Sequence, residues 1–362
     1  MDYCRRAITG VSFLSAFFAG VIEGFYGRQW TWSERHDHVG FLSSVGLQTY
    51  IYAPKGDAFL RSKWSESWPL DTFDELLALS EHCRACNIEF GIGLSPLELF
   101  RDYNQAGRSA LIKKVALINR LNVSVLCILF DDMPGDFTGL AKQQLAIVND
   151  VLSVSKAARH IVCPTYYSYD PVLEDVFGKM PAHYFEELGE GLPQSVGVFW
   201  TGDKVISATI TVEQLTDISA KLKRKPVLWD NIIVNDGKKT ADFLRLIPIS
   251  GRSHNLPDAL SGQLINPMNQ PYLSQLALAS LLPNYVQAVS FKKIVEQSLP
   301  ATLSRLIARD CQLFNERGLQ GLSTDDKVLK IQEYQQCRHP AAEEIIQWLK
   351  GDYCFDPDCL TG

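Results

Sequence analysis

Two adjacent carboxylates, Asp131 and Asp132, end the apolar run Val123–Phe130. Charged side chains are costly to bury, so acids at the end of a buried strand indicate the rim of a cleft. Close carboxylates also push their pKa values apart, so that one stays charged while the other keeps its proton and can serve as an acid. Taken alone, however, such a pair favours a helix cap or a divalent-metal site over catalysis.

Metal and nucleotide chemistry are disfavoured by residues elsewhere in the chain. The histidines are dispersed, and no His-x-x-x-His or His-x-Glu pair accompanies the two acids. Gly91 and Gly93 lack the third glycine of a dinucleotide-binding loop, because Pro96 stands in its place. We therefore predict no metal site and no cofactor.

Aromatic and amide side chains follow other strand-like runs in the same way that the acids follow theirs. They are Phe25, Tyr26, Trp30, Tyr52, Tyr167, Trp200, Trp229, Asn231, Asn235 and Asn266. Aromatic faces combined with directional amide and carboxylate hydrogen bonds suit a neutral ligand with many hydroxyl groups, such as a sugar. A phosphate would instead require glycine-rich loops and basic residues. Some of the aromatics fit a plain barrel core, whereas the three asparagines fit it poorly.

The run before Asp131 is one of eight apolar runs that end in polar, glycine or proline residues. The other seven lie at 21–24, 50–55, 90–95, 161–167, 198–202, 227–231 and 264–267. Segments with helical spacing are found at 33–44, 72–86, 109–121, 140–158, 171–178, 212–222, 240–246 and 273–282. This alternation predicts an α/β fold, a (β/α)8 TIM barrel with its site at the carboxyl ends of the strands. An open doubly wound sheet is the alternative.

Only helical segments follow residue 290. We predict them at 291–296, 303–314 and 326–350, and we expect the tail from Cys354 to Cys359 to be frayed. The predicted organisation is therefore a (β/α)8 catalytic domain at 1–289 and a short C-terminal helical appendage at 290–362.

Composition limits the classes of partner and location. The 362 residues are 46% hydrophobic, and a net charge of −6 argues against a nucleic-acid partner, which would need a concentrated basic face. Nine scattered cysteines predict reduced thiols and a cytoplasmic location. The apolar stretch 7–20 after Arg5 and Arg6 resembles a signal peptide, so export is the alternative, although cleavage near Ala19 would cut the first predicted strand, 17–23. No uninterrupted apolar run reaches the roughly 18 residues of a membrane span.

Six motifs occur in order between about Gly20 and Tyr285. They are Gly20–Trp30 (GVIEGFYGRQW), Thr49–Lys55 (TYIYAPK), Leu129–Asp132 (LFDD), Cys163–Tyr167 (CPTYY), Trp200–Gly202 (WTG) and Leu228–Asp236 (LWDNIIVND). Together they closely resemble glycoside hydrolase family 84, the family of O-GlcNAcases and related β-N-acetylglucosaminidases. The resemblance implies a (β/α)8 barrel and retaining hydrolysis of terminal β-linked N-acetylglucosamine. The 2-acetamido group of the substrate would act as the nucleophile and form an oxazoline intermediate.

The resemblance also implies roles for individual residues. Asp131 would accept a hydrogen bond from the acetamide N–H, and Asp132 would protonate the leaving oxygen and later activate water, which requires that it hold a proton near neutral pH. The implied substrate-binding residues are Gly24 and Lys55 at the sugar hydroxyls, Tyr167 at the acetamido group, Asn231 at its carbonyl, Trp229 on the pocket wall, Asp236 at the distal hydroxyls and Asn266 as a further sugar contact.

Two positions depart from the family pattern. Animal members usually carry Glu where Tyr166 stands and Tyr where Gly237 stands. The implied partner is an N-acetylglucosaminyl glycoside, with an O-GlcNAc-modified protein as one such substrate. Two alternatives stay open: a barrel that binds N-acetylglucosamine without hydrolysing it, which Tyr166 and the short chain favour, and a metal-dependent hydrolase that uses the acid pair.

Overall fold

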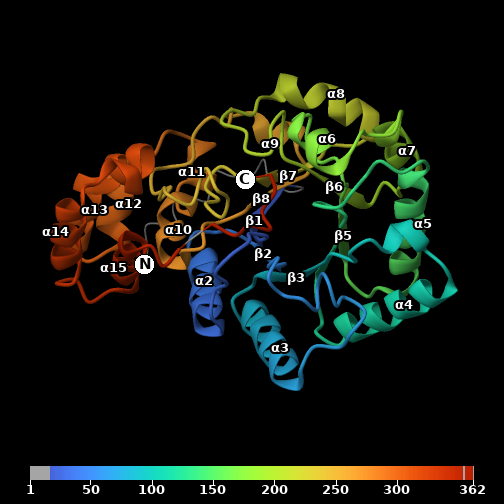
Figure 1. Cartoon of the computed structure of the whole chain (residues 1–362), viewed down its shortest axis with the longest axis horizontal. Helices are drawn as coiled ribbons and strands as arrows, with labels where there is room; N and C mark the ends of the chain where they lie inside the picture. The colour runs from blue at the N-terminus through green and yellow to red at the C-terminus, as the bar shows by residue number, and fades with distance from the viewer. Residues whose placement is uncertain (1–16, 354, 362) are drawn as a thin grey trace.

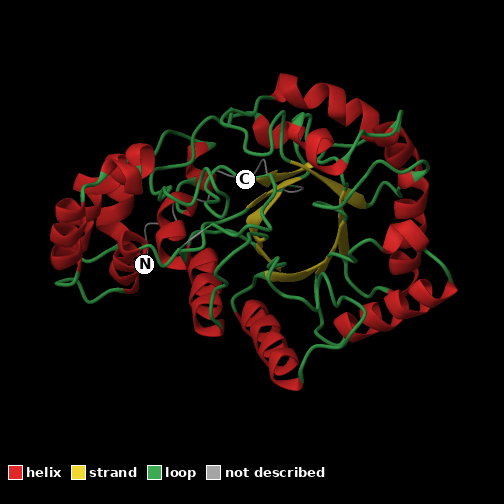
Figure 2. Ribbon diagram, in the orientation of Figure 1, coloured by secondary structure: helices red, strands yellow, loops and turns green. Residues whose placement is uncertain are grey.

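The structure is a computed structural model that describes residues 17–353 and 355–361. Eight parallel strands form a closed barrel in which sequence neighbours pair and β1 pairs with β8 (Figure 2). The strands are β1 (Phe18–Glu23), β2 (Thr49–Tyr52), β3 (Glu89–Leu94), β4 (Val125–Leu129), β5 (Arg159–Cys163), β6 (Val196–Trp200), β7 (Val227–Asp230) and β8 (Gly262–Ile265). The predicted barrel is confirmed, and the open sheet is excluded because no strand lies at an edge among the described residues.

Helices surround the strands and cover the outer face of the barrel (Figure 1). They are α2 (Trp32–Ser44), α3 (Leu70–Ala85), α4 (Gln105–Asn119), α5 (Leu140–Val154), α6 (Val172–Phe177), α7 (Tyr184–Gly191), α8 (Val212–Leu222), α9 (Leu256–Ala259), α10 (Pro271–Leu278) and α11 (Leu281–Asn284), with a 3-10 turn at Leu99–Asp102. Because the strands are covered on both faces, they are nearly uniform apolar runs, as parallel strands of this kind are.

The prediction of a helix at 240–246 is wrong. The backbone there is tied to other segments, because Leu244 donates its N–H to the carbonyl of Phe314 at 3.1 Å and Asn235 donates to the carbonyl of Phe243. Those bonds take the place of a helical ladder, and the short helix α9 lies further along the same connection. Helix α7, between β5 and β6, had no counterpart among the predicted segments.

The C-terminal appendage consists of α12 (Phe291–Ser298), α13 (Ala301–Gln312), α14 (Thr324–Tyr334) and α15 (Pro340–Lys350), with a π turn at Leu313–Arg317 and a 3-10 turn at Leu319–Gly321. The single helix predicted at 326–350 is therefore two helices. Pro340 has no N–H to continue a helix but fits a first turn, and the ring of His339 accepts a hydrogen bond from the N–H of Ala341 as the cap.

The appendage shares a second hydrophobic core with the barrel, in which α10 packs against α12 and α15. Glu344 on α15 accepts hydrogen bonds from the N–H groups of Tyr272 and Leu273 in the first turn of α10. Burial raises the pKa of this carboxyl to about 8. The shared core packs the barrel and the appendage into one unit. The division into domains at 289/290 therefore stays a proposal.

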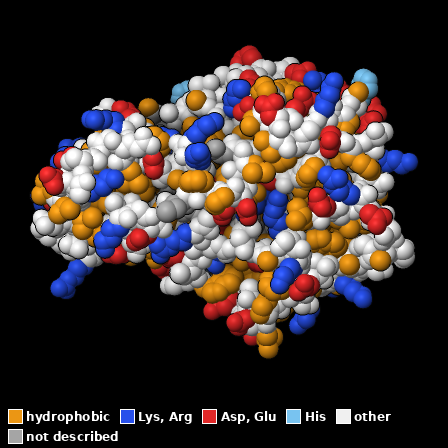
Figure 3. Space-filling view, in the orientation of Figure 1, with side chains coloured by type: hydrophobic (Ala, Val, Ile, Leu, Met, Phe, Trp, Pro, Cys, Tyr) orange, Lys and Arg blue, Asp and Glu red, His pale blue; other side chains and the backbone are white. Residues whose placement is uncertain are grey.

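Charged side chains of both signs are interspersed with apolar ones on the face seen in Figure 3. In the part of the chain that the structure describes, no helix is both long and apolar enough to cross a membrane. Residues 7–16 of the apolar stretch that resembles a signal peptide lie outside the described residues.

Candidate active site

Asp131 and Asp132 lie directly after β4, at the carboxyl end of the barrel. Asp132 has a φ of 55°, in the left-handed region that residues other than glycine rarely adopt. Its main-chain carbonyl accepts a hydrogen bond from Nη2 of Arg61 at 2.8 Å. Backbone strain of this kind persists only where surrounding contacts hold it, and it is concentrated at functional sites.

The two oxygens of Asp131 have different surroundings. Oδ2 forms a buried ion pair with Nζ of Lys55, which also lies 3.5 Å from Oδ2 of Asp132. Oδ1 is buried and has no hydrogen-bond donor within residues 17–353 and 355–361. A buried carboxylate oxygen without a donor is costly, so it is suited to a donor supplied by a ligand.

Both oxygens of Asp132 are held by phenols. The hydroxyl of Tyr26 donates to Oδ2 at 2.8 Å, and that of Tyr167 donates to Oδ1 at 3.0 Å. Burial favours the neutral acid, but the charges of Lys55 and Arg61 and these two hydrogen bonds outweigh it and hold the pKa of Asp132 below its usual range. In the free protein these contacts favour the ionised form of Asp132, and the expectation that it holds a proton near neutral pH stays a prediction for the substrate complex.

A chain of hydrogen bonds links the ends of β7, β8 and β1. Oδ1 of Asn231 accepts from Nε1 of Trp229 at 2.9 Å and from Nδ2 of Asn266 at 3.0 Å. Oδ1 of Asn266 in turn accepts from the N–H of Gly24 at 3.2 Å. A Cβ on Gly24 would stand 2.3 Å from the indole of Trp229, so only glycine lets the indole lie against this strand end.

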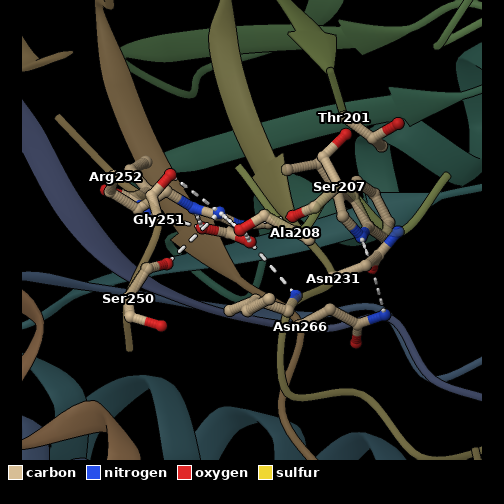
Figure 4. A network of polar contacts seen from close by, with 12 residues as sticks. Thr201, Ser207, Ala208, Asn231, Ser250, Gly251, Arg252 and Asn266 are labelled. Carbon is tan, nitrogen blue, oxygen red and sulfur yellow. Dashed lines mark hydrogen bonds and ion pairs between the residues drawn. The ribbon is translucent and has the colours of Figure 1, made fainter. Parts of the chain in front are cut away.

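A buried ion pair lies beside this chain of hydrogen bonds (Figure 4). Arg252 pairs with Asp230 at the end of β7 and donates to the carbonyls of Ser207 and Ala208. The loop after β6 is thereby fixed to β7, and the carbonyl of Val205 in that loop accepts from Nδ2 of Asn231 at 2.9 Å. Since Nδ2 has a second hydrogen, Asn231 can still donate to a ligand.

Asp236 lies in the loop after β7. One of its oxygens accepts a hydrogen bond from the N–H of Tyr26 at 2.7 Å. Burial raises the pKa of Asp236 to about 6, because little solvent or cationic charge compensates the carboxylate.

These groups line one cavity, together with residues that sequence reasoning had not assigned to the site. The wall is made by Tyr26, Asp131, Asp132, Cys163, Tyr167, Thr201, Val205, Ile206, Trp229, Asn231, Val234, Asp236, Asn266, Cys359 and Thr361. Of the predicted site residues, only Gly24 and Lys55 are not on the wall, and both contact residues that are. Tyr26 stands inside the first motif, so the sequence could have indicated its place in the site. Arg61 lies in a loop without any motif, and only its contact with Asp132 shows that it belongs to the site.

Two other polar residues from the sequence lie away from the cavity. Asn235 joins the loop after β7 to Gln270 and Asn269. Tyr166 is buried beside the site residue Tyr167, where its hydroxyl donates to the carbonyl of Gly178 and its ring packs edge-on against Tyr184. The aromatic ring at this departure from the family pattern thus fills the core behind the cavity.

The tail is not frayed over its described residues, 355–361. The main-chain N–H of Asp356 donates to the carbonyl of Asp236, and its Oδ2 accepts from the N–H of Gly27 at 3.0 Å. Cys359 and Thr361 reach the cavity wall. The sequence contained no sign of this contact, because it depends on where α15 directs the chain.

No group of three or more His, Cys, Asp and Glu side chains among the described residues is placed to hold a metal ion. Lys55 occupies one oxygen of Asp131, and the two phenols occupy those of Asp132. What this arrangement can do is offer carboxylate and amide hydrogen bonds to an uncharged ligand next to an acid–base group.

Fold and site together define a (β/α)8 barrel of the glycoside hydrolase class, with an acid pair and an amide-lined wall at the carboxyl ends of its strands. The sequence profile of the beta-N-acetylglucosaminidase family matches residues 19–312. The chain belongs to this family, glycoside hydrolase family 84.

Individual relatives agree with this assignment. The protein O-GlcNAcases of Mus musculus and Rattus norvegicus are each 31% identical over 321 residues, which is 85% of this chain and 34% of the relative. The chain thus spans about a third of the length of these curated relatives. The solved structure of a mutant of the Thermobaculum terrenum O-GlcNAc hydrolase matches with a TM-score of 0.75 and 28% identity, covering 93% of this chain and 81% of that one.

Proposed function

We propose that this protein is a retaining β-N-acetylglucosaminidase that removes terminal β-linked N-acetylglucosamine through an oxazoline intermediate. The observation that carries the proposal is that the two oxygens of Asp131 differ in their hydrogen-bond partners. Lys55 fixes one of them, and the other is buried without a donor in the described chain. An acetamide N–H bonded to that free oxygen would turn its carbonyl oxygen toward the anomeric carbon, which is the geometry that ring closure needs.

Asp132 would carry the proton transfers, after taking up a proton when the bound sugar displaces water from the cavity and so raises its pKa. In the first step the acetamide carbonyl oxygen bonds to the anomeric carbon, the bond to the leaving oxygen breaks, and the proton of Asp132 passes to that oxygen, while Oδ1 of Asp131 takes the acetamide N–H proton. In the second step a water oxygen bonds to the anomeric carbon, the bond from that carbon to the oxazoline oxygen breaks, one water proton passes to Asp132, and Asp131 returns its proton to the acetamide nitrogen. Because the nucleophile belongs to the substrate, the adjacent acids need not span a sugar ring as two separate enzyme carboxylates do.

The remaining residues would hold the sugar. We assign Asn231 to the acetamide carbonyl, with Tyr167 and Trp229 around the acetamido group. Asp236, Asn266, Lys55 and the backbone at Gly24 would take the ring hydroxyls. Support comes from the bond chain Trp229–Asn231–Asn266–Gly24, which fixes the amides before a ligand arrives and so lowers the entropic cost of binding.

We further propose an O-GlcNAc-modified protein as a substrate, on the strength of the relatives named protein O-GlcNAcase. A cytoplasmic location fits that substrate and fits the buried thiols Cys83, Cys127 and Cys163. Release of N-acetylglucosamine from a modified protein would test the first point. A thiol titration of the unfolded protein that found fewer free thiols before reduction than after it would reveal disulfides and contradict the cytoplasmic location.

The test of the catalytic proposal compares two leaving groups. Asp132→Ala should lower kcat/KM by roughly 10²-fold or more for an alkyl N-acetylglucosaminide, whose leaving oxygen needs a proton. It should lower the value much less for an aryl glycoside with an acidic phenol. Asp325→Asn, at an exposed position on α14, is the control for loss of one carboxylate.

Equal losses on both glycosides would contradict the assignment of Asp132. If the wild type bound N-acetylglucosamine but hydrolysed neither compound, the sugar-binding alternative would replace the proposal.

A further inference from the structure

The segment 355–361 runs from the appendage to the mouth of the barrel. In Figure 1 the red end of the chain leaves α15 and ends over the strands near β7 and β8. Tyr353, at the start of this path, packs its ring against the guanidinium of Arg28 at 4.9 Å. Arg28 lies in the loop after β1, so this contact directs the chain toward the candidate active site.

Asp356 fixes the segment to two loops of the site. Its Oδ2 accepts from the N–H of Gly27 after β1, and its own N–H donates to the carbonyl of Asp236 after β7 at 3.2 Å. Its Oδ1 accepts from the N–H of Asp358, and its carbonyl accepts from the N–H of Cys359. These last two bonds turn the chain inward, and the charge of Asp358 interacts with Arg61.

The turn delivers Cys359 and Thr361 to the cavity wall, among the groups assigned to catalysis. The side chain of Thr361 interacts with the phenol of Tyr167, which donates a hydrogen bond to Asp132. With the segment in place, the remaining cavity is about 50 Å³. Small-molecule sites generally measure about 300–1,000 Å³, so this space takes water but not a sugar ring.

We propose that the segment 355–361 is an intramolecular competitor of the sugar: it closes the cavity of the free protein and leaves when substrate enters. This inference rests on the proposed function, since it assumes that the cavity binds the sugar. The segment is suited to reversible release, because Phe355 and Leu360 are 41% and 60% exposed and contribute little apolar burial. Its hold therefore depends on a few hydrogen bonds, each of which contributes only modestly to the closed state.

Competition of this kind has a defined kinetic signature. The apparent affinity for substrate falls by the fraction of molecules that are open, so a segment closed for about nine-tenths of the time raises KM about tenfold. The chemistry after binding is unchanged, so kcat is not affected. An aryl N-acetylglucosaminide serves as substrate for the full chain and for a variant in which 355–361 is replaced by glycine and serine at equal length.

We expect KM to fall at least about threefold in the replaced variant, with kcat unchanged. Asp356→Ala, which removes the bond to Gly27, should shift KM in the same direction by a smaller factor. Asp325→Asn, the same kind of charge loss on the distant helix α14, should leave both constants at the wild-type values. A synthetic peptide with the sequence of 355–361 should inhibit the replaced variant competitively and the wild type more weakly.

Binding of free N-acetylglucosamine, followed by tryptophan fluorescence, separates this inference from the catalytic proposal. Tighter binding by the replaced variant would support the competitor role even if neither protein hydrolysed the glycoside. Equal dissociation constants and equal KM values in wild type and both tail variants, with no inhibition by the peptide, would overturn it.

Discussion

Arg61 holds the backbone of Asp132: its Nη2 lies 2.8 Å from the carbonyl oxygen of a residue whose φ is 55°. Nη1 of the same guanidinium donates to Oγ of Ser95 at the end of β3, which anchors Arg61 to the barrel. Asp132, the proposed proton-transfer group, thus has its side chain held by two phenols and its strained main chain held by a cation.

Arg61→Gln should affect Asp132 in two measurable ways. Loss of the donor to the carbonyl should lower kcat by about 10-fold or more, because a displaced acid–base group loses part of its roughly 10²–10⁴-fold contribution. Loss of the cation should raise the pKa of Asp132, which Arg61 now lowers, so the basic limb of the kcat/KM profile should move to higher pH. Arg61→Lys, which keeps the charge, should shift that limb less. A variant that lost activity at every pH without moving the limb would point to a structural role only.

Asp131→Asn should lower kcat for every leaving group by roughly 10²-fold or more. The amide has one acceptor in place of the carboxylate pair, and the charge that favours transfer of the acetamide proton is lost. The loss should be equal for alkyl and acidic aryl glycosides, unlike that of Asp132→Ala. Steady-state rates with both substrates check this, and an unimpaired Asp131→Asn variant would remove Asp131 from the mechanism.

Asp236 should make the stability of the protein depend on pH. Burial raises its pKa to about 6, so the native state binds the proton more tightly than the unfolded chain does, and stability is highest below the unfolded pKa of about 3.9. As the pH rises through 6, up to about 3 kcal/mol of unfolding free energy should be lost. Asp236→Asn cannot ionise, so in denaturant titrations it should gain stability relative to wild type between pH 4 and pH 7. A difference that did not change with pH would contradict the assignment.

Gly24→Ala should damage the site through packing alone. The new Cβ would stand 2.3 Å from the ring of Trp229, which Phe199 and Asn231 prevent from moving freely. We expect a loss of about 1–3 kcal/mol in unfolding free energy and a large rise in KM. Gly40→Ala is the matched control, because nothing lies within 4 Å of its added Cβ in the middle of α2. Alanine should stabilise that helix by about 0.5–1 kcal/mol.

A chelator should leave glycosidase activity unchanged. Three of the four carboxylate oxygens of the acid pair are already bound by Lys55, Tyr26 and Tyr167. Activity lost on dialysis against the chelator and restored by a divalent metal would favour the metal-dependent alternative.

The sequence by itself determined the barrel and about half of the cavity wall. Each strand is a short apolar run that ends in a polar cluster, and in a closed parallel barrel all such ends meet at one face. Asp131, Asn231 and Asn266 could therefore be assigned to one site from their order alone. Local composition likewise placed most of the helices, but it missed α7 and predicted α14 and α15 as one helix. It also predicted a helix at 240–246, where hydrogen bonds to distant segments replace the helical ladder.

Only the tertiary structure decided the charge state of Asp132, the part played by Arg61 and the course of the tail. Each depends on atoms far apart in the sequence: Lys55 and Arg61 outweigh burial at Asp132, and Asp356 reaches Gly27 and Asp236 because α15 packs against α10. Electrostatic and hydrogen-bond energies vary steeply with distance and burial, which a local pattern of residues does not specify. The adjacent acids were visible in the chain, but their unequal roles follow from what the fold places around them.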